Sequence, residues 1–316
     1  MMRRENSLAL VLGILAAGHS ASAQIPQSGN DEIHVLPVQG SVYMLVGPGG
    51  NITAQAGSDG VLLVDTLPAP LAPKIAAELK KLTSKPLRYI IDTSAAPDRV
   101  SGNAVLAAMG APGASPDFGP RATIIAHSNV MNRMTAPVGK QLPPLTDVPN
   151  DEYSTPTKDL WFNGEPVIIF HEPQAHSDGD SIVLFRRSDV ISAGDIFTPD
   201  RYPFIDLARG GSIQGELDAL NHLLHLTVPE RLQDGGTRVI PGHGRLCNEA
   251  DVVEYRDMAT IIRDRIQDMV KRGLTLEQVK AARPTLDYDT QYGSGDAFTE
   301  AVFKSLSNSK PVNTKN

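Results

Sequence analysis

The sequence contains a single cysteine, few aromatic residues and no excess of positive charge. Cys247 alone excludes an intrachain disulfide and any zinc site built from several cysteines. Aromatic residues make up 5% of the 316 residues, and 29 basic residues stand against 36 acidic ones, for a formal net charge of −7. Nucleic acids and anionic membranes attract proteins with a basic excess, which this chain lacks. We therefore expect no nucleic-acid partner.

Long apolar runs are also scarce, and the clearest one lies close to the N-terminus. Arg3 and Arg4 precede an apolar run over residues 8–17, and the small residues 21–23 follow it. This order is typical of a secretory signal peptide that is cleaved after Ala23. The run is too short to span a bilayer. The sequence thus predicts a signal peptide over residues 1–23, a mature chain without an integral membrane segment, and a periplasmic or extracellular location.

The rest of the chain has the pattern of one globular domain over residues 30–305, with a disordered tail over residues 306–316. Short apolar runs bounded by glycine or proline predict strands, and stretches with a helical period predict helices. Strands are predicted at 33–36, 42–46, 61–65, 87–91, 122–126, 159–162, 166–170, 181–185, 190–192 and 237–240. Helices are predicted at 73–82, 103–109, 214–226, 249–272 and 275–282. Two similar halves of this kind predict sheets packed together with helices outside.

One long segment, residues 131–158, has five prolines and little periodicity. A loop of this length inside a compact domain is usually functional. We therefore interpret it as a mobile lid or wall of a binding pocket, in which Arg133 and Lys140 are candidate contacts for an anionic substrate.

Four acidic or histidine residues directly follow predicted strands and lie beside glycine or proline. They are Asp98, His176, Asp195 and His243. Strand ends are where a rigid scaffold presents polar groups to a cleft. Two imidazoles and two carboxylates, if they converge, form a suitable donor set for a divalent metal ion. Spacing alone does not decide between this site and four separate structural residues.

Several blocks of the sequence resemble the metallo-β-lactamase superfamily in order and spacing. The blocks are residues 61–66 (VLLVDT), 92–93 (DT), 102–103 (GN), 175–181 (AHSDGDS), 193–197 (AGDIF) and 239–244 (VIPGHG), and the resemblance covers roughly residues 32–262. It implies an α+β fold, an αββα sandwich of two mixed β-sheets flanked by helices, with metal held at one edge between the sheets. It also implies hydrolysis of an ester, thioester or lactam bond in a small-molecule substrate by a metal-bound hydroxide.

The metal-binding signature of that family is degenerate in this chain. Where the family reads His-x-His-x-Asp-His, this sequence has Ser94, Ala96, Asp98 and Arg99 at the four ligand positions. The first metal position then keeps only His176, and the second keeps Asp98, Asp195 and His243. Ala96 has no donor atom and a neutral serine hydroxyl is a poor zinc ligand, so we do not expect an ordinary dinuclear centre.

Three interpretations of the site stay open. In the first, one divalent ion (zinc, or else manganese or iron) is bound by Asp98, Asp195 and His243, with His176 as fourth ligand or base. In the second, no ion is bound and the Arg99 guanidinium supplies the positive charge between the two carboxylates. In the third, Ser94 is a nucleophile and His176 its base. The first predicts a hydrolase with Asp98 and His176 as catalytic residues. The second predicts a metal-free, non-catalytic binding protein of the same fold.

The remaining candidates have simpler explanations. We expect His127, His222 and His225 to be structural or solvated, Asp180 to fix the turn after His176, and Cys247 to be a small buried side chain. Within the resemblance, Asp65 is expected to support the ligand loop rather than to bind metal. The sequence leaves the oligomeric state and the particular substrate open.

Overall fold

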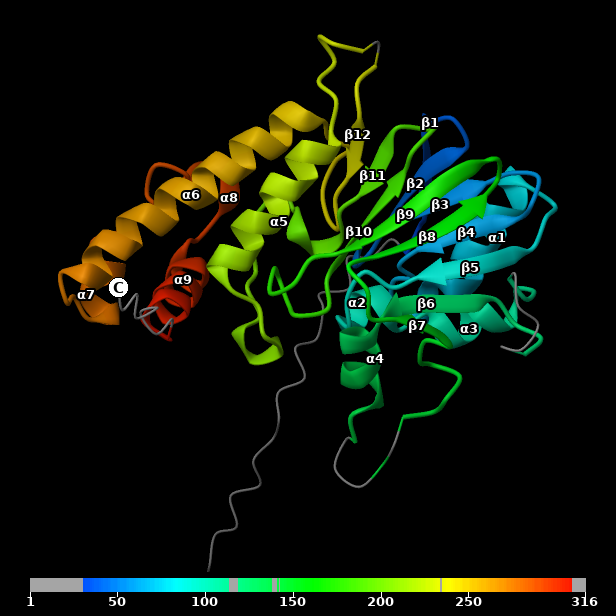
Figure 1. Cartoon of the computed structure of the whole chain (residues 1–316), viewed down its shortest axis with the longest axis horizontal. Helices are drawn as coiled ribbons and strands as arrows, with labels where there is room; N and C mark the ends of the chain where they lie inside the picture. The colour runs from blue at the N-terminus through cyan, green and yellow to red at the C-terminus, as the bar shows by residue number, and fades with distance from the viewer. Residues whose placement is uncertain (1–30, 114–118, 138–140, 142, 234, 309–316) are drawn as a thin grey trace, which may run out of the picture.

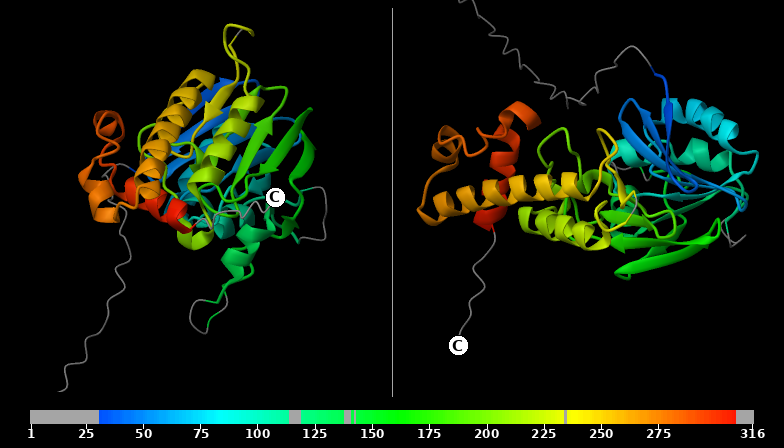
Figure 2. Two further views of the ribbon diagram at one scale, coloured as in Figure 1. Left: turned by 60° about the vertical axis from the view of Figure 1, so that its left-hand side comes forward. Right: turned by 90° about the horizontal axis from the view of Figure 1, so that it is seen from above.

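The structure is a computed structural model that describes residues 31–113, 119–137, 141, 143–233 and 235–308. The predicted signal peptide lies outside these residues. The described chain forms four layers, with two β-sheets packed face to face and helices on both outer sides (Figures 1 and 2). This is the αββα sandwich of two mixed sheets that the resemblance implies.

The first sheet has seven strands in sequential order, antiparallel from β1 to β4 and parallel from β4 to β7. Its strands are β1 (His34–Gln39), β2 (Val42–Gly47), β3 (Gly50–Ala56), β4 (Val61–Val64), β5 (Leu87–Ile91), β6 (Thr123–His127) and β7 (Asp151–Tyr153). Helices α1 (Ala72–Leu82) and α3 (Asn103–Ala108) pack on its outer face. Parallel pairing needs crossover connections, and these two helices lie in the connections after β4 and β5.

The second sheet has five strands in the order β12-β11-β10-β9-β8, and only β11 and β12 are parallel. Its strands are β8 (Thr157–Phe162), β9 (Glu165–His171), β10 (Ser181–Phe185), β11 (Val190–Ser192) and β12 (Arg238–Ile240). The helices α5 (Ile213–Leu226) and α6 (Glu249–Lys271) cover its outer face, and α9 (Asp296–Asn308) packs against both of them (Figure 2). Two short helices, α7 (Leu276–Ala281) and α8 (Asp289–Tyr292), lie between α6 and α9 in the chain.

Side-chain alternation along the strands explains why both faces of each sheet are buried. In β4, Val61 and Leu63 point to the outer core under α1 and α3, whereas Leu62 and Val64 point to the core between the sheets. All four are at most 1% exposed. Burying such a side chain fully is worth about 1.5–3 kcal/mol, so each strand of this kind contributes to two layers at once.

The segment over residues 131–158, which we interpreted as an unstructured lid, has more secondary structure than the sequence predicted. Helix α4 (Ser128–Thr135) and strand β7 lie partly or wholly within it, and β8 begins at Thr157. His127 caps α4, since its Nδ1 accepts a hydrogen bond from the Asn129 N–H. Lys140 lies outside the described residues, so a contact between Lys140 and a substrate stays a prediction.

The C-terminal boundary also differs from the prediction. Helix α9 continues to Asn308, three residues beyond the predicted end of the domain, and residues 309–316 lie outside the described part of the chain. Within the residues that the structure describes, no helix is both long and apolar enough to cross a membrane.

Candidate functional site

The polar residues predicted from the sequence lie at the edge where β5, β9, β11 and β12 end. Asp98 and Arg99 belong to the one-turn helix α2 (Pro97–Val100), which begins with a proline shortly after β5. Asp195 lies in the 3-10 helix η3 (Gly194–Ile196) directly after β11, and His243 follows β12. Because β11 and β12 are parallel, both of their carboxyl ends lie at the same edge.

Asp65 holds the loop that leads from β5 to α2. Its carboxylate accepts hydrogen bonds from the N–H and the hydroxyl of Thr93, at 2.9 Å each. Burial raises the pKa of Asp65 to about 7, although the charge of Arg99 opposes this shift. These contacts agree with the supporting role that we expected for Asp65.

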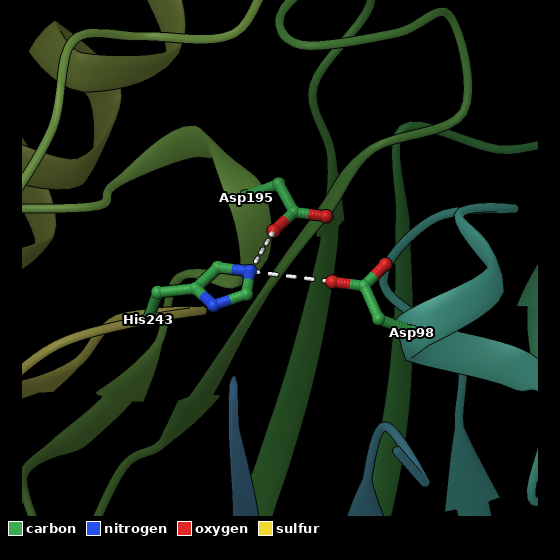
Figure 3. Close-up of side chains that lie close together, drawn as sticks. All are labelled: Asp98, Asp195 and His243. Carbon is green, nitrogen blue, oxygen red and sulfur yellow. Dashed lines mark ion pairs between the residues drawn. The ribbon is translucent and has the colours of Figure 1, made fainter. Parts of the chain in front are cut away.

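Asp98, Asp195 and His243 meet at this edge (Figure 3). Each offers one ligand atom, and the three atoms lie within 4.8 Å of one another. His243 Nε2 is 3.2 Å from Asp98 Oδ2 and 3.8 Å from Asp195 Oδ1. Carboxylate oxygen and imidazole nitrogen are ligands for zinc and other divalent ions. The structure therefore brings three of the four predicted ligands together as a possible metal-binding group.

The guanidinium of Arg99 lies against all three of these ligand atoms. Its Nη2 is 2.8 Å from Asp195 Oδ1, 2.8 Å from His243 Nε2 and 3.3 Å from Asp98 Oδ2. Its Nε donates to Asp195 Oδ2 at 3.1 Å, so Arg99 and Asp195 form a bidentate pair. Because a guanidinium only donates, His243 Nε2 is the acceptor of its contact. Arg99 is 0% exposed and is among the largest fully buried side chains of the described chain.

Backbone groups of both sheets complete the surroundings of Arg99. Nη1 donates to the carbonyl of Asn51 on β3 at 3.4 Å, and Nη2 donates to the carbonyl of Gly242 at 3.1 Å. Gly50 has a φ of +128°, and a Cβ there would lie 2.6 Å from the Gly242 oxygen and 3.2 Å from Arg99 Nη2. Only glycine therefore fits at this position beside the guanidinium.

With Arg99 in this position, a metal ion does not fit the three ligand atoms. An ion bound to all three at about 2.0–2.2 Å would be held close to their plane, since two of the separations are already 3.2 and 3.8 Å. Arg99 Nη2 lies 2.8–3.3 Å from each of the three ligand atoms. The ion would therefore be in close contact with a positively charged nitrogen that has no free lone pair. Arg99 therefore supplies the positive charge beside these two carboxylates.

The ionisation of the site follows from this arrangement. Burial opposes the charged form of Asp195, but the charge and hydrogen bonds of Arg99 outweigh it and lower the pKa of Asp195 to about 2. Burial likewise opposes the charge of Arg99, yet Asp195, Asp65 and Asp98 raise its pKa. The Asp195 carboxylate and the Arg99 guanidinium are therefore both charged at neutral pH, and the guanidinium is fully buried.

His176, the fourth predicted ligand, lies outside the three-residue group. It is on the loop between β9 and β10, and its Nδ1 contacts Asp180 Oδ1 at 3.1 Å. Asp180 also accepts from the Ser177 N–H, as expected of a residue that fixes this turn. Burial opposes protonation of His176, but the hydrogen bond and charge of Asp180 raise its pKa to about 9. An imidazolium is a proton donor, so the structure favours His176 as an acid or hydrogen-bond donor and not as a base at neutral pH.

The two degenerate positions upstream of Asp98 have different surroundings. Ser94 is 1% exposed, and its Oγ accepts a hydrogen bond from the Ala96 N–H, so it stabilises the turn before α2. Ala96 contributes an apolar surface to the cavity described below. This geometry gives no support to Ser94 as a nucleophile, since a nucleophile needs a base within hydrogen-bond reach.

A cavity of about 670 Å³ opens above these residues, and we call it the Phe204 pocket. It is lined by Gly49, Ala96, Pro97, Asp98, His176, Asp195, Thr198, Arg201, Phe204, Arg209 and His243. Phe204 is 65% exposed and its ring centroid lies 5.5 Å from that of His176. A second cavity of about 750 Å³ shares Gly49, Arg201 and His243 with it and is otherwise lined by residues of the β1–β3 region and by residues 244–246. None of the described residues within 131–158 lines the Phe204 pocket.

Sequence reasoning missed the wall of this pocket and one buried acid beneath it. Thr198, Arg201, Phe204 and Arg209 lie in the irregular segment between η3 and α5, where no periodic pattern marks them. Glu216 on α5 is 0% exposed, and neither of its carboxylate oxygens has a hydrogen-bond partner. The sequence did indicate that Glu216 is buried, because its spacing places it on the same helix face as the apolar residues Ile213 and Leu220.

The other candidates have structural surroundings. His127 and His171 stack on each other, and His222 contacts Glu172 at 2.6 Å. Cys247 is buried, and burial raises the pKa of its thiol to about 12. Arg133 pairs with Asp178 at 2.7 Å rather than standing free for a substrate. A thiol with a raised pKa is a poor nucleophile, in agreement with the expectation for Cys247.

Comparison with known proteins defines the class to which this architecture belongs: the chain has the metallo-β-lactamase fold. It is similar to the stereoselective inverting sec-alkylsulfatase Pisa1 from Pseudomonas sp., with 17% identity and a TM-score of 0.66 over 90% of this chain and 52% of the sulfatase. It is also similar to DIM-1 metallo-β-lactamase (14% identity, TM-score 0.54) and to a metallo-β-lactamase from Pontibacter korlensis (12% identity, TM-score 0.55). Each of these two comparisons covers 72% of this chain, with 97% of DIM-1 and 99% of the other enzyme.

The chain spans about half the length of the alkylsulfatase that it matches. No protein-family model matches the sequence, and comparison with curated proteins gives no matching sequence. At these identities the comparisons define the fold, and the neighbours that they name are hydrolases of that fold.

Proposed function

We propose that this protein binds a small organic molecule in the Phe204 pocket and that it does so without a catalytic metal ion. The observation that carries the proposal is the position of Arg99 Nη2 at 2.8–3.3 Å from the three ligand atoms of Asp98, Asp195 and His243. The fold and the pocket of a hydrolase are retained, while the cation beneath the pocket is a side chain. Of the interpretations that the sequence leaves open, this geometry favours the metal-free binding protein.

The walls of the pocket favour a ligand with an apolar body. Phe204, Ala96 and Pro97 present carbon atoms to the cavity. The cationic side chains on the wall each have a carboxylate partner already, with Arg201 bound to Asp200, Arg209 to Asp206 and His176 to Asp180. A ligand of strong negative charge would have to compete with these carboxylates. Neutral molecules with an ester, thioester or lactam group, the class suggested by the resemblance, meet this requirement.

A hydrolase with one divalent ion on Asp98, Asp195 and His243 is the second candidate. It is favoured by the three ligand atoms within 4.8 Å and by the hydrolases among the proteins of similar fold. It requires that Arg99 leave the position described above, and His176 would then be available as a further ligand or as a catalytic acid. Zinc, manganese and iron all accept such a donor set.

We further propose that the protein acts outside the cytoplasm, as the predicted signal peptide over residues 1–23 indicates, in the periplasm or the extracellular medium. Its partner in this proposal is a small molecule.

Binding and turnover are tested together on the purified protein. Thermal shift and calorimetry are run with a neutral aryl ester, a thioester, a cephalosporin and an alkyl sulfate, with and without chelator. We expect binding of at least one neutral probe that is unaffected by chelator, and weaker binding in Phe204→Ala. Trp161→Ala is the control, because Trp161 is 73% exposed on β8 and is not part of the pocket lining. Chelator-sensitive hydrolysis, together with one equivalent of metal in the untreated protein, would replace the proposal with the second candidate.

A further inference from the structure

We propose that Arg99 is the resident cation of a latent metal site: Asp98, Asp195 and His243 are arranged to bind one divalent ion, and the guanidinium of Arg99 keeps the ion out. The inference concerns the chain's own residues and does not depend on which ligand enters the Phe204 pocket.

The charges explain why Arg99 and a divalent ion exclude each other. Asp195 accepts two hydrogen bonds from Arg99, and Asp98 accepts a third, so one guanidinium already compensates the two carboxylates in part. A divalent ion added beside it would bring three positive charges next to two negative ones, with the guanidinium itself fully buried. Removal of the guanidinium leaves an excess of negative charge at the site, because two carboxylates then lie close together without a cation.

Contacts to both sheets keep Arg99 in this place. Its Nη1 donates to the carbonyl of Asn51 in the first sheet, and its Nη2 donates to the carbonyl of Gly242, which follows β12 of the second sheet. The Asn51 N–H donates to the same Gly242 oxygen at 2.9 Å, so the backbone around the guanidinium is itself cross-linked. An arginine that moved out to admit an ion would leave both carbonyls and both carboxylates without this donor.

The backbone segments that carry the three ligand residues, in contrast, are held by contacts that do not involve the Arg99 side chain. The Ala193 N–H donates to Ile240 O and the Gly242 N–H donates to Gly194 O at 2.7 Å, which fixes the segments of Asp195 and His243 against each other. Asp98 lies on α2, whose first residue is Pro97. We therefore expect the donor triangle to persist when the guanidinium is removed.

Cobalt(II) is the probe for this site, because its visible absorption depends on the number and geometry of its ligands. CoCl₂ is titrated into wild type, Arg99→Ala and Arg99→His at low temperature, with absorption spectra, calorimetry and metal analysis after gel filtration. Arg99→His adds an imidazole donor and fills part of the space. We expect one equivalent bound by each variant, and affinity at least about tenfold higher than in wild type. We also expect the metal to raise the melting temperature of the variants only.

Two further variants make the test specific. Arg201→Ala removes an exposed arginine from the wall of the same pocket and should not gain cobalt binding. Arg99→Ala combined with Asp195→Asn should lose the binding that Arg99→Ala gained. Retention of cobalt by this double variant would place the metal elsewhere and overturn the proposal.

The cobalt titration of wild type gives a result even if the Arg99 variants do not fold. If wild type binds one equivalent of cobalt with a spectrum that His243→Ala abolishes, Arg99 does not exclude the ion and the proposal is overturned. If both Arg99 variants fold but bind no cobalt, the triangle is not a metal site and the proposal is equally overturned. Failure of every small-molecule probe would count against the proposed function alone.

Discussion

The imidazole rings of His127 and His171 stack face to face, with centroids 3.5 Å apart and planes that differ by 7°. Burial and the neighbouring His171 lower the pKa of His127 to about 4, and burial also lowers the pKa of His171. His127 Nδ1 accepts the hydrogen bond that caps α4. Protonation of both rings would thus place two like charges in contact, and protonation of His127 at Nδ1 would remove the acceptor at the start of this helix.

The first prediction concerns the pH dependence that this pair confers. An unfolded histidine binds its proton near pH 6.5, whereas folded His127 binds it near pH 4, so the unfolded state holds more protons between these values. Stability from this group is therefore present above pH 6.5 and is lost as the pH falls toward 4. We expect His127→Asn, whose amide caps helices at any pH, to show a smaller loss between pH 7 and pH 5, by on the order of 1 kcal/mol.

Urea unfolding of wild type and His127→Asn at pH 7 and pH 5 measures this difference. His225→Gln is the control, because His225 contacts the carbonyl of Asn221 within its own helix. An equal pH dependence in wild type and His127→Asn would contradict the prediction. The comparison between variants is needed because other buried groups, among them His176 and Asp65, titrate in the opposite sense.

The second prediction concerns His176 and Asp180. The raised pKa of His176 means that its stabilising contribution is present below pH 6.5 and is lost as the pH rises through about 9. Asp180→Asn removes the carboxylate whose hydrogen bond and charge raise the pKa of the imidazole most, so the pKa of His176 should fall below about 9, although the charge of Asp195 still opposes the effect of burial. An NMR titration of the His176 ring measures this value. Asp178→Asn, which removes an acid two residues away that pairs with Arg133, should leave it close to 9.

The third prediction concerns Glu216, whose two carboxylate oxygens are buried without a partner. Burial raises its pKa well above the ordinary value and so favours the uncharged form, which still carries a hydroxyl without a partner. Methionine has a similar length and no group that needs a partner. We expect Glu216→Met to raise the free energy of unfolding by about 1 kcal/mol, measured by urea denaturation at pH 7. A decrease of about 2 kcal/mol or more would show that the carboxyl has a bound partner, such as a buried water.

The fourth prediction concerns the stability that depends on Arg99. Its removal leaves two carboxylates and the Asn51 carbonyl without the guanidinium donor, while the Gly242 carbonyl keeps only the Asn51 N–H, so Arg99→Met should lose about 3–5 kcal/mol. Arg201→Met, which breaks a pair that is about half exposed, should lose less than about 1 kcal/mol. Adding Asp98→Asn and Asp195→Asn to Arg99→Met should recover part of the loss. Chemical denaturation of the four proteins checks the order.

The fifth prediction concerns export. Mass spectrometry of the mature protein from the producing cells should find an N-terminus at Gln24, directly after the predicted cleavage site. A soluble, mature protein that begins at Met1 would contradict this, and Ala23→Arg should block the cleavage in a matched culture.

Most of the fold could be predicted because its strands and helices have strong local patterns. Strands β10 and β11 and the C-terminal end of α5 coincide with the predicted residues, since short apolar runs bounded by glycine and a clear helical period leave little choice. The convergence of Asp98, Asp195 and His243 followed from the ends of strands that the resemblance placed side by side. Helix α4 was missed because its apolar residues are few and its N-cap is a histidine, which is not a usual cap.

The direction of Arg99 was the part of the site that the sequence could not decide. The residue type allowed a surface side chain, a neighbour of a metal ion or a replacement for one. The outcome depends on Asn51, Gly50 and Gly242, which come from distant parts of the chain and accept or accommodate the guanidinium. The role of His176 was equally undecided, because a contact with Asp180 suits an imidazole that binds a metal ion as well as an imidazolium that binds none.

Because the cation of this site is an arginine, every copy of the chain receives it during synthesis. A site that depends on an ion is complete only in the copies that have bound one, and a fraction of them stays empty when the ion is scarce. Here the positive charge is part of the chain itself, so its stoichiometry is fixed. Chelators and a shortage of trace metals in the surroundings leave that charge untouched, since the guanidinium holds its proton throughout the physiological range.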